Sequence, residues 1–138
     1  MSFIPWKEEY ELGITEIDEQ HQKMLAIINK LHDILGRRAL GDQLHIDTII
    51  KEMADYAIYH FQTEEKYFDI FGYEQAKEHI AIHNQYWNKV AEWQERYNIN
   101  KDKAVFYEIF EYLQNWWIWH ICHTDRDYVP FFKANGLK

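Results

Sequence analysis

Hydrophobic residues recur every three or four positions along four long segments, and this repeat predicts four amphipathic α-helices. In the first segment the apolar positions are Met24, Leu25, Ile28, Leu31, Ile34 and Leu35. We expect the four helices at residues 18–38, 44–70, 74–97 and 102–122. Asp18 and Asp102 favour helix N-termini and Gly72 favours a helix C-terminus, so these three residues set the predicted boundaries.

The predicted helices are joined by short links, which favour neighbours that run in opposite directions. We therefore expect an all-α fold, an up-down-up-down antiparallel four-helix bundle, with residues 1–138 as one domain. Residues 1–17 contain Pro5 and Gly13 and lack the helical repeat, so they predict an extended N-terminal arm. After the fourth helix Pro130 limits a short C-terminal tail, which we expect to dock on the bundle.

Composition narrows the classes of function. The 138 residues are 47% hydrophobic, enough for a buried core, and the net charge of −8 disfavours a nucleic-acid partner. No run of about 18 apolar residues predicts a transmembrane helix, and no signal peptide is recognisable. The single cysteine, Cys122, fits a reducing compartment. We expect a cytoplasmic monomer.

Histidine and carboxylate side chains recur at helical spacing inside this pattern. His60 and Glu64 are four residues apart, so they share one face of the second predicted helix. Further candidate donors are His79 with His83, His120 with Asp125, and His21 near the start of the first helix. In an antiparallel bundle the start of helices one and three and the end of helices two and four meet at one pole. All seven side chains should therefore converge.

Five imidazoles and two carboxylates at one level are too many for a single tetrahedral zinc ion. Their mixture of nitrogen and oxygen donors suits a pair of iron ions inside a helix bundle, although ligand type alone leaves manganese open. Without a cation, burying such a set costs on the order of a few kcal/mol for each unpaired group. His32, His45 and His123 lie outside the set, and we expect them at the surface or in supporting positions.

Four short motifs, in this order, resemble those of the hemerythrin family, and specifically the single-domain bacterial hemerythrins. They are I-D-x-Q-H ending at His21, H-F-x-x-E-E at residues 60–65, H-x-x-x-H at 79–83, and H-I-x-x-T-D at 120–125. The resemblance spans nearly the whole chain. It implies a bundle that carries a non-haem di-iron centre.

The resemblance also implies a role for each donor. His79, His83 and His120 would hold one iron, and His21 and His60 the other. Glu64 and Asp125 would bridge the two ions, together with a solvent-derived oxo or hydroxo group. The second iron would then keep one open position, where members of the family bind O2.

Reversible O2 binding, for storage or for delivery to oxygen-requiring enzymes, is the function that we expect, without enzymatic activity. Terminal imidazoles are neutral donors, and no His follows a Glu by three residues, the pairing used by di-iron oxidases and ferritins. The alternatives are a di-iron oxidase or peroxidase, or a sensor of O2, redox state or iron. We expect an apolar O2 pocket lined by Met24, Leu25, Phe61, Trp116, Trp117 and Ile121.

Overall fold

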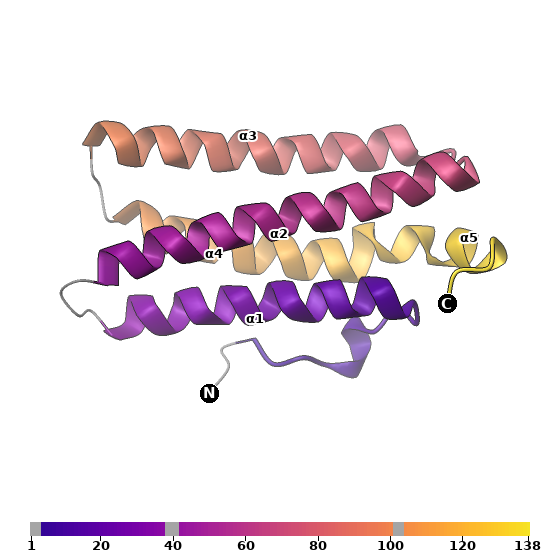
Figure 1. Cartoon of the computed structure of the whole chain (residues 1–138), viewed down its shortest axis with the longest axis horizontal. Helices are drawn as coiled ribbons and strands as arrows, with labels where there is room; N and C mark the ends of the chain where they lie inside the picture. Colours follow the sequence, from indigo (N-terminus) through magenta and orange to yellow (C-terminus); the bar gives the residue numbers. More distant parts are fainter. Residues whose placement is uncertain (1–3, 38–41, 101–103) are drawn as a thin grey trace.

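The computed structural model describes residues 4–37, 42–100 and 104–138, and helices account for most of them (Figure 1). The four long helices are α1 (Thr15–Arg37), α2 (Asp42–Phe71), α3 (Ala76–Asn100) and α4 (Ala104–Trp119). Among the described residues there is no strand, so the predicted all-α class is confirmed. No helix in these ranges is long and apolar enough to cross a membrane.

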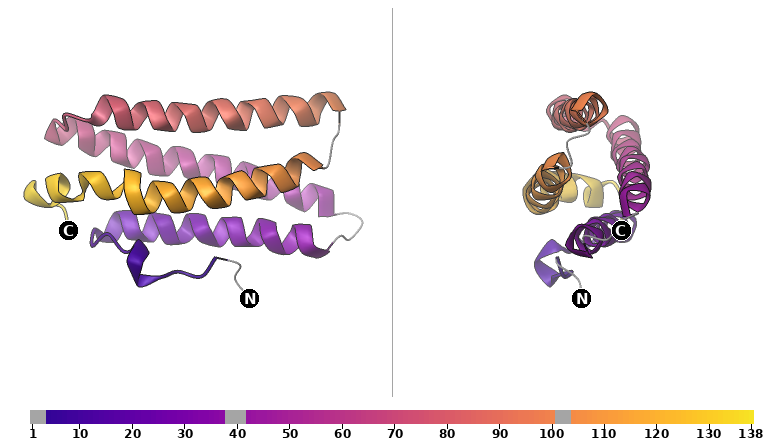
Figure 2. Two further views of the ribbon diagram at one scale, coloured as in Figure 1. Left: turned by 180° about the vertical axis from the view of Figure 1, so that it is seen from behind. Right: turned by 90° about the vertical axis from the view of Figure 1, so that its left-hand side faces the viewer.

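The helices form an antiparallel bundle in which sequence neighbours lie side by side. α1 packs against α2 and α4, and α3 completes the bundle against the same two helices. The end-on view in Figure 2 shows the four helices around a common axis. The starts of α1 and α3 and the ends of α2 and α4 lie at one pole, which also carries the C-terminus (Figure 1).

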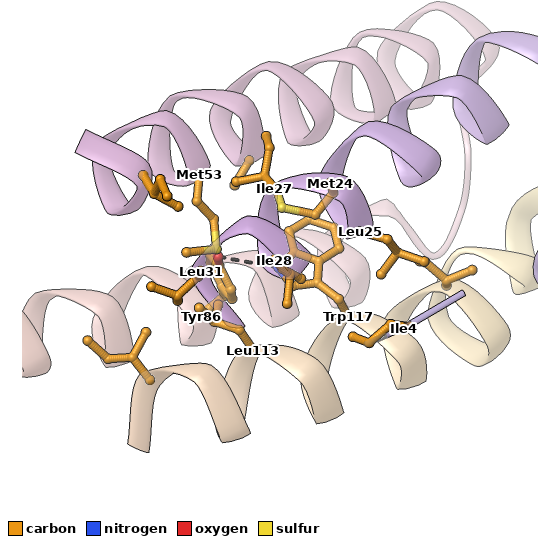
Figure 3. Packing of buried hydrophobic residues seen from close by; sticks show 14 of the residues in the cluster. Ile4, Met24, Leu25, Ile27, Ile28, Leu31, Met53, Tyr86, Leu113 and Trp117 are labelled. Carbon is orange, nitrogen blue, oxygen red and sulfur yellow. Dashed lines mark hydrogen bonds between the residues drawn. The ribbon is translucent and has the colours of Figure 1, made fainter. Parts of the chain in front are cut away.

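The interior of the bundle is filled by one large hydrophobic cluster. α1 contributes Met24, Ile28 and Leu31, none of which is exposed to solvent. Across the core, the indole nitrogen of Trp117 donates a hydrogen bond of 3.4 Å to the hydroxyl of Tyr86 (Figure 3). Each fully buried large apolar side chain stabilises the fold by roughly 1.5–3 kcal/mol relative to an exposed one. This burial holds the helices, and the pole that they share, in register.

Residues 4–14 of the N-terminal arm are extended, as predicted, apart from one 3-10 turn at Glu8–Tyr10. Asn29 fixes the arm to α1, because its side chain accepts a hydrogen bond from the backbone N–H of Ile4 and donates one to the Ile4 carbonyl. The prediction of Asp18 as the N-cap was wrong, since α1 begins three residues earlier. The Asp18 carboxylate reaches back to accept hydrogen bonds from the backbone N–H groups of Leu12 and Gly13.

The C-terminal part of the bundle departs from the prediction. α4 ends at Trp119 and is followed by a π-helical turn, His120–Thr124, a 3-10 turn, Arg126–Tyr128, and a short helix, α5 (Val129–Ala134). Pro130 does not limit a tail but lies at the start of α5, where a missing N–H costs no hydrogen bond. The predicted docking is nevertheless found, because Tyr128 and Phe132 are fully buried in a second cluster with Phe68.

Gly72 ends α2 as predicted. Its φ of 70° is a left-handed conformation that glycine adopts without strain, and its N–H donates to the carbonyl of Phe68. α3 runs three residues further than the predicted end at residue 97. The predicted cap at Asp102 lies outside the residues that the structure describes.

Candidate metal centre

The structure brings the seven predicted donors together at one pole of the bundle. They come from α1, α2, α3 and the π-helical segment that follows α4, including its C-cap residue Asp125, and they are buried, with exposed fractions between 0% and 5%. Two groups have ligand atoms within 4.8 Å of one another: Glu64, His79, His83, His120 and Asp125 form one, and His21, His60 and Asp125 form the other. Asp125 therefore belongs to both.

The two oxygens of Asp125 face different imidazoles. Oδ2 lies 2.7 Å from Nε2 of His21 and 3.1 Å from Nε2 of His60. Oδ1 lies 2.7 Å from Nε2 of His120 and 3.1 Å from Nε2 of His79. A carboxylate in this position can give one oxygen to each of two cations.

Glu64 lies at the centre of the same cluster. Its Oε1 is 3.1 Å from Nε2 of His83 and 3.4 Å from the Nε2 atoms of His60 and His79. The i,i+4 spacing on α2 places His60 and Glu64 on one face, and the same spacing on α3 aligns His79 and His83. The local helical repeat is thus sufficient to orient four of the seven donors.

The pair His120 and Asp125 needs a different local geometry. In a regular α-helix two residues five apart point about 140° away from each other, because each residue turns the helix by about 100°. The π-helical turn removes most of this angle: the N–H of Asp125 donates to the carbonyl of His120, five residues back, at 2.7 Å. Both side chains consequently face the cluster.

The electrostatics of the cluster favour ionised carboxylates. Burial raises the pKa of Asp125, but the facing imidazoles, His120 foremost, outweigh burial and hold this pKa well below its usual range. Burial and Asp125 raise the pKa of Glu64, and His60 and His79 then lower it well below the usual range. Burial lowers the pKa of His79, yet the two carboxylates raise it to about 10. At neutral pH the carboxylates would recruit positive charge, from a proton or from a metal ion.

The buried polar atoms fit a metal better than they fit one another. Among the described residues, both oxygens of Glu64, Oδ1 of Asp125 and the Nε2 atoms of His79, His83 and His120 are buried without a hydrogen-bond partner. Such atoms are rare in folded proteins, where nearly all buried polar groups are satisfied. All six belong to the cluster, and a cation among them removes the cost of desolvating them.

Gln20 is a supporting residue whose role the sequence pattern did not predict. Its buried side-chain carbonyl accepts a hydrogen bond of 2.7 Å from Nδ1 of His60, and its amide donates to the hydroxyl of Thr63 at 3.1 Å. Thr63 in turn donates to the carbonyl of Tyr59. This chain fixes the His60 tautomer with a hydrogen on Nδ1, which leaves Nε2 free for a cation. The sequence does contain a signal for this role, because Gln20 directly precedes His21 in the I-D-x-Q-H motif.

Tyr128 is a second residue whose position beside the donors was not predicted. The sequence predicted only that its segment docks on the bundle. Its ring is fully buried and lies 5.5 Å from the ring of His79. Burial raises the pKa of its hydroxyl well above the usual value, and the negative charges of Asp125 and Glu64 raise it further. Tyr128 therefore places a neutral phenol beside the carboxylates.

The predicted O2-pocket residues lie on different sides of the cluster. Phe61 and Trp117 have ring centroids 5.8 Å and 5.7 Å from that of His60, whereas Trp116 stacks on His120 at 4.3 Å. The remaining three are buried members of the main core: Met24, Leu25 and Ile121. Phe61 also stacks on His83 with ring centroids 3.8 Å apart, so the apolar wall that it forms with Trp117 adjoins both groups of donors.

The other three histidines lie apart from the cluster or outside the described side chains. His32 is half-buried, 3.6 Å from the carboxylate of Asp33. His123 is exposed and stacks on Trp119. The side chain of His45 is not among those that the structure describes. Neither described histidine belongs to the groups that could hold a metal.

Comparison with known proteins finds matches over nearly the whole chain. The family model of the hemerythrin HHE cation binding domain matches residues 12–132. The chain is 35% identical to a bacteriohemerythrin of Clostridium acetobutylicum, over 90% of this chain and 97% of that protein. It is 31% identical to a bacteriohemerythrin of Pseudomonas aeruginosa, over 94% and 81%. A crystal structure of wild-type hemerythrin superposes with a TM-score of 0.81 at 25% identity, covering 94% of this chain and 97% of that one.

Proposed function

The chain belongs to the hemerythrin family, and from this premise we propose that it binds O2 reversibly at a pair of non-haem iron ions, for oxygen storage or delivery to oxygen-consuming enzymes. One observation carries the proposal. The two oxygens of Asp125 face two separate groups of imidazoles, so one carboxylate can hold two cations close together. A site built for one ion would not need this division.

We assign the donors by their neighbours. His79, His83 and His120 would hold one iron and His21 and His60 the other, while Glu64 and Asp125 would bridge both. The second group has one imidazole fewer, which leaves a position for an external ligand. When bound, the ferrous pair supplies two electrons that O2 can take up and return.

The residues around the second group would protect this exchange. Phe61 and Trp117 cover His60 with apolar rings and exclude water, which slows the loss of reduced oxygen and oxidation of the iron. Gln20 holds the Nδ1 proton of His60, so that imidazole stays oriented with Nε2 toward the ion. Neither Phe61 nor Trp117 offers a group that would react with an organic substrate.

The proposal is tested with anaerobically reduced, iron-loaded protein. On exposure to air a visible charge-transfer band should appear, and it should fade on degassing and return on a second exposure. Iron analysis should give a pair of ions for each chain. Irreversible oxidation in the first cycle would instead indicate an oxidase or a sensor, and loading with one ion would overturn the assignment of two groups.

We also propose that the protein works as a cytoplasmic monomer. The location is supported by its single cysteine, Cys122, which forms no internal disulfide and fits a reducing compartment. Cell fractionation and light scattering at several protein concentrations test the two parts separately.

A further inference from the structure

A cavity of about 720 Å³ lies at the ligand-bearing pole, outside the donor cluster. The turn between α2 and α3, the first turns of α3, and the segment from Thr124 to α5 form its walls. Figure 1 shows these segments at the same end of the bundle. The cavity therefore lies where the metal centre comes nearest to the end of the molecule.

The cavity reaches the metal centre through His79. This residue lines the cavity, and its exposed fraction of 5% is the largest among the seven donors, the other six being 2% exposed or less. Its Nε2 has no hydrogen-bond partner and lies 3.4 Å from Glu64 and 3.1 Å from Asp125. Thr124, the residue before Asp125, also lines the cavity. One imidazole thus separates the cavity from the two carboxylates.

Apart from His79 at its inner end, the charged side chains around the cavity are carboxylates. Glu74, Glu78 and Asp127 are exposed lining residues, and no Lys or Arg lines the cavity. Within the described ranges none of these three carboxylates forms an ion pair. Tyr73 lies among them: burial raises the pKa of its hydroxyl, and the charges of Asp127 and Glu78 raise it further. The carboxylates therefore face a shared space.

We propose that this acidic cavity is the route by which divalent metal ions enter the centre, with Glu78 and Asp127 as transient ligands that pass the ion to His79. The inference rests on the proposed metal centre. A hydrated divalent cation meets oxygen donors that suit it before it reaches the buried imidazoles. Convergent charges in a cleft concentrate counter-ions and accelerate their association.

Helix stability gives a competing explanation for part of this charge. Acidic side chains in the first turn of α3 interact favourably with the helix dipole, which would account for Glu78 without any ion. Asp127 is not on α3 but in the 3-10 turn before α5, so that explanation does not cover it. Measuring stability and metal uptake on the same variants separates the two roles.

The test measures uptake of Co²⁺ by the full-length protein after chelation has removed its metal. Stopped-flow absorbance gives the second-order rate for wild type and for the double variant E78Q/D127N. The matched control is E52Q/D55N, which removes the same charge from α2, with Glu52 about 18 Å along the helix from Glu64. We expect uptake by E78Q/D127N to be slower by about tenfold and less sensitive to salt, with unchanged final stoichiometry and melting temperature.

The possible outcomes distinguish this route from the proposed function. Equal rates in wild type and E78Q/D127N, or equal slowing in E52Q/D55N, would overturn the route while leaving the metal centre intact. A lower final stoichiometry in E78Q/D127N would make its carboxylates part of the centre and would also overturn the route. Wild type that takes up no Co²⁺ at equilibrium would overturn both the proposed function and the route.

Discussion

At the scale of single residues, the two buried carboxylates make different contacts with the imidazoles. Asp125 divides its oxygens between two groups, whereas Glu64 directs Oε1 toward His60, His79 and His83. Removing either side chain leaves a single carboxylate among the five imidazoles, and His83 or His21 loses its carboxylate contact. Each group would then bind a cation more weakly, and the loss of Asp125 would also remove the oxygens that link the two groups.

We therefore predict that Glu64→Ala and Asp125→Ala each lower metal affinity at least tenfold, since even supporting residues of metal sites contribute about 10–100-fold. Metal content after gel filtration measures the loss. His32→Ala is the control, because His32 lies outside both groups, and it should retain the wild-type content. Equal metal content in all three variants would contradict the assigned ligands.

Gln20 orients the imidazole of His60 through a hydrogen bond to Nδ1. Replacing it with Ala leaves Nδ1 of His60 without its acceptor, so we expect metal affinity to fall about 10–100-fold while the fold persists. Gln20→Glu keeps an acceptor at the same position and should restore most of the affinity. Competition with a chelator measures the change. The neighbouring exposed Gln22→Ala should have no effect, and if Gln20→Ala behaves in the same way, the orienting role is wrong.

The sequence predicted the convergence of the seven side chains better than the contacts of the residues around them. His60 with Glu64, and His79 with His83, follow from helical spacing, and the antiparallel order of the helices brings the pairs together. Gln20 was not assigned a role, because its contact depends on the side-chain conformations of residues 40 positions apart. The position of Tyr128 could not be predicted for a similar reason, since its burial depends on how α5 folds back onto the bundle.

At the scale of elements, the π-helical turn determines whether α4 completes the site. The spacing from His120 to Asp125 is five residues, which a regular helix would direct to different sides. Nothing in the helical repeat marks a π turn, so the sequence predicted the position of the pair at the pole but not the geometry that aligns it. Such turns are frequent at functional sites.

The start of α1 is tied to the N-terminal arm by Asp18. The Asp18 carboxylate accepts hydrogen bonds from two backbone N–H groups just before the helix, those of Leu12 and Gly13. Since each hydrogen bond to a charged group contributes roughly 1.5–3 kcal/mol, the loss of both in Asp18→Ala should lower the free energy of unfolding by about 3–6 kcal/mol. Urea denaturation of the metal-free protein measures it. Glu19→Ala, at an exposed position in the same turn, is the control, and equal stability of both variants would refute the assignment.

At the scale of the whole molecule, two hydrophobic clusters enclose the pole that carries the donors. The larger fills the bundle, and the smaller joins Tyr128 and Phe132 to Phe68. Helical periodicity predicted the first cluster because it extends along long helices. The helix α5 was missed because it has only six residues and contains Pro130, which favours a helix end except near the N-terminus.

The charge balance of the pole determines how metal binding depends on pH. In the metal-free protein burial lowers the pKa of His79, but Glu64 and Asp125 raise it to about 10, so this imidazole is protonated at pH 7. The same carboxylates raise the pKa of His120 against the effect of burial. Protonation of His79 stabilises the metal-free fold below pH 6.5, the ordinary value for histidine, and this contribution is lost as the pH rises through about 10.

Metal ions must displace these protons, because only a neutral imidazole can be a ligand. Binding at pH 7 should therefore release at least the proton of His79, and affinity should weaken as the pH falls. Glu64 and Asp125 release none, since their pKa values are held well below the usual range. Calorimetric titration with Co²⁺ in buffers of different ionisation enthalpy counts the protons, and His32→Ala should give the same count. If no proton is released, His79 is already neutral in the metal-free protein, and the carboxylates do not hold the charge that we assign to this pole.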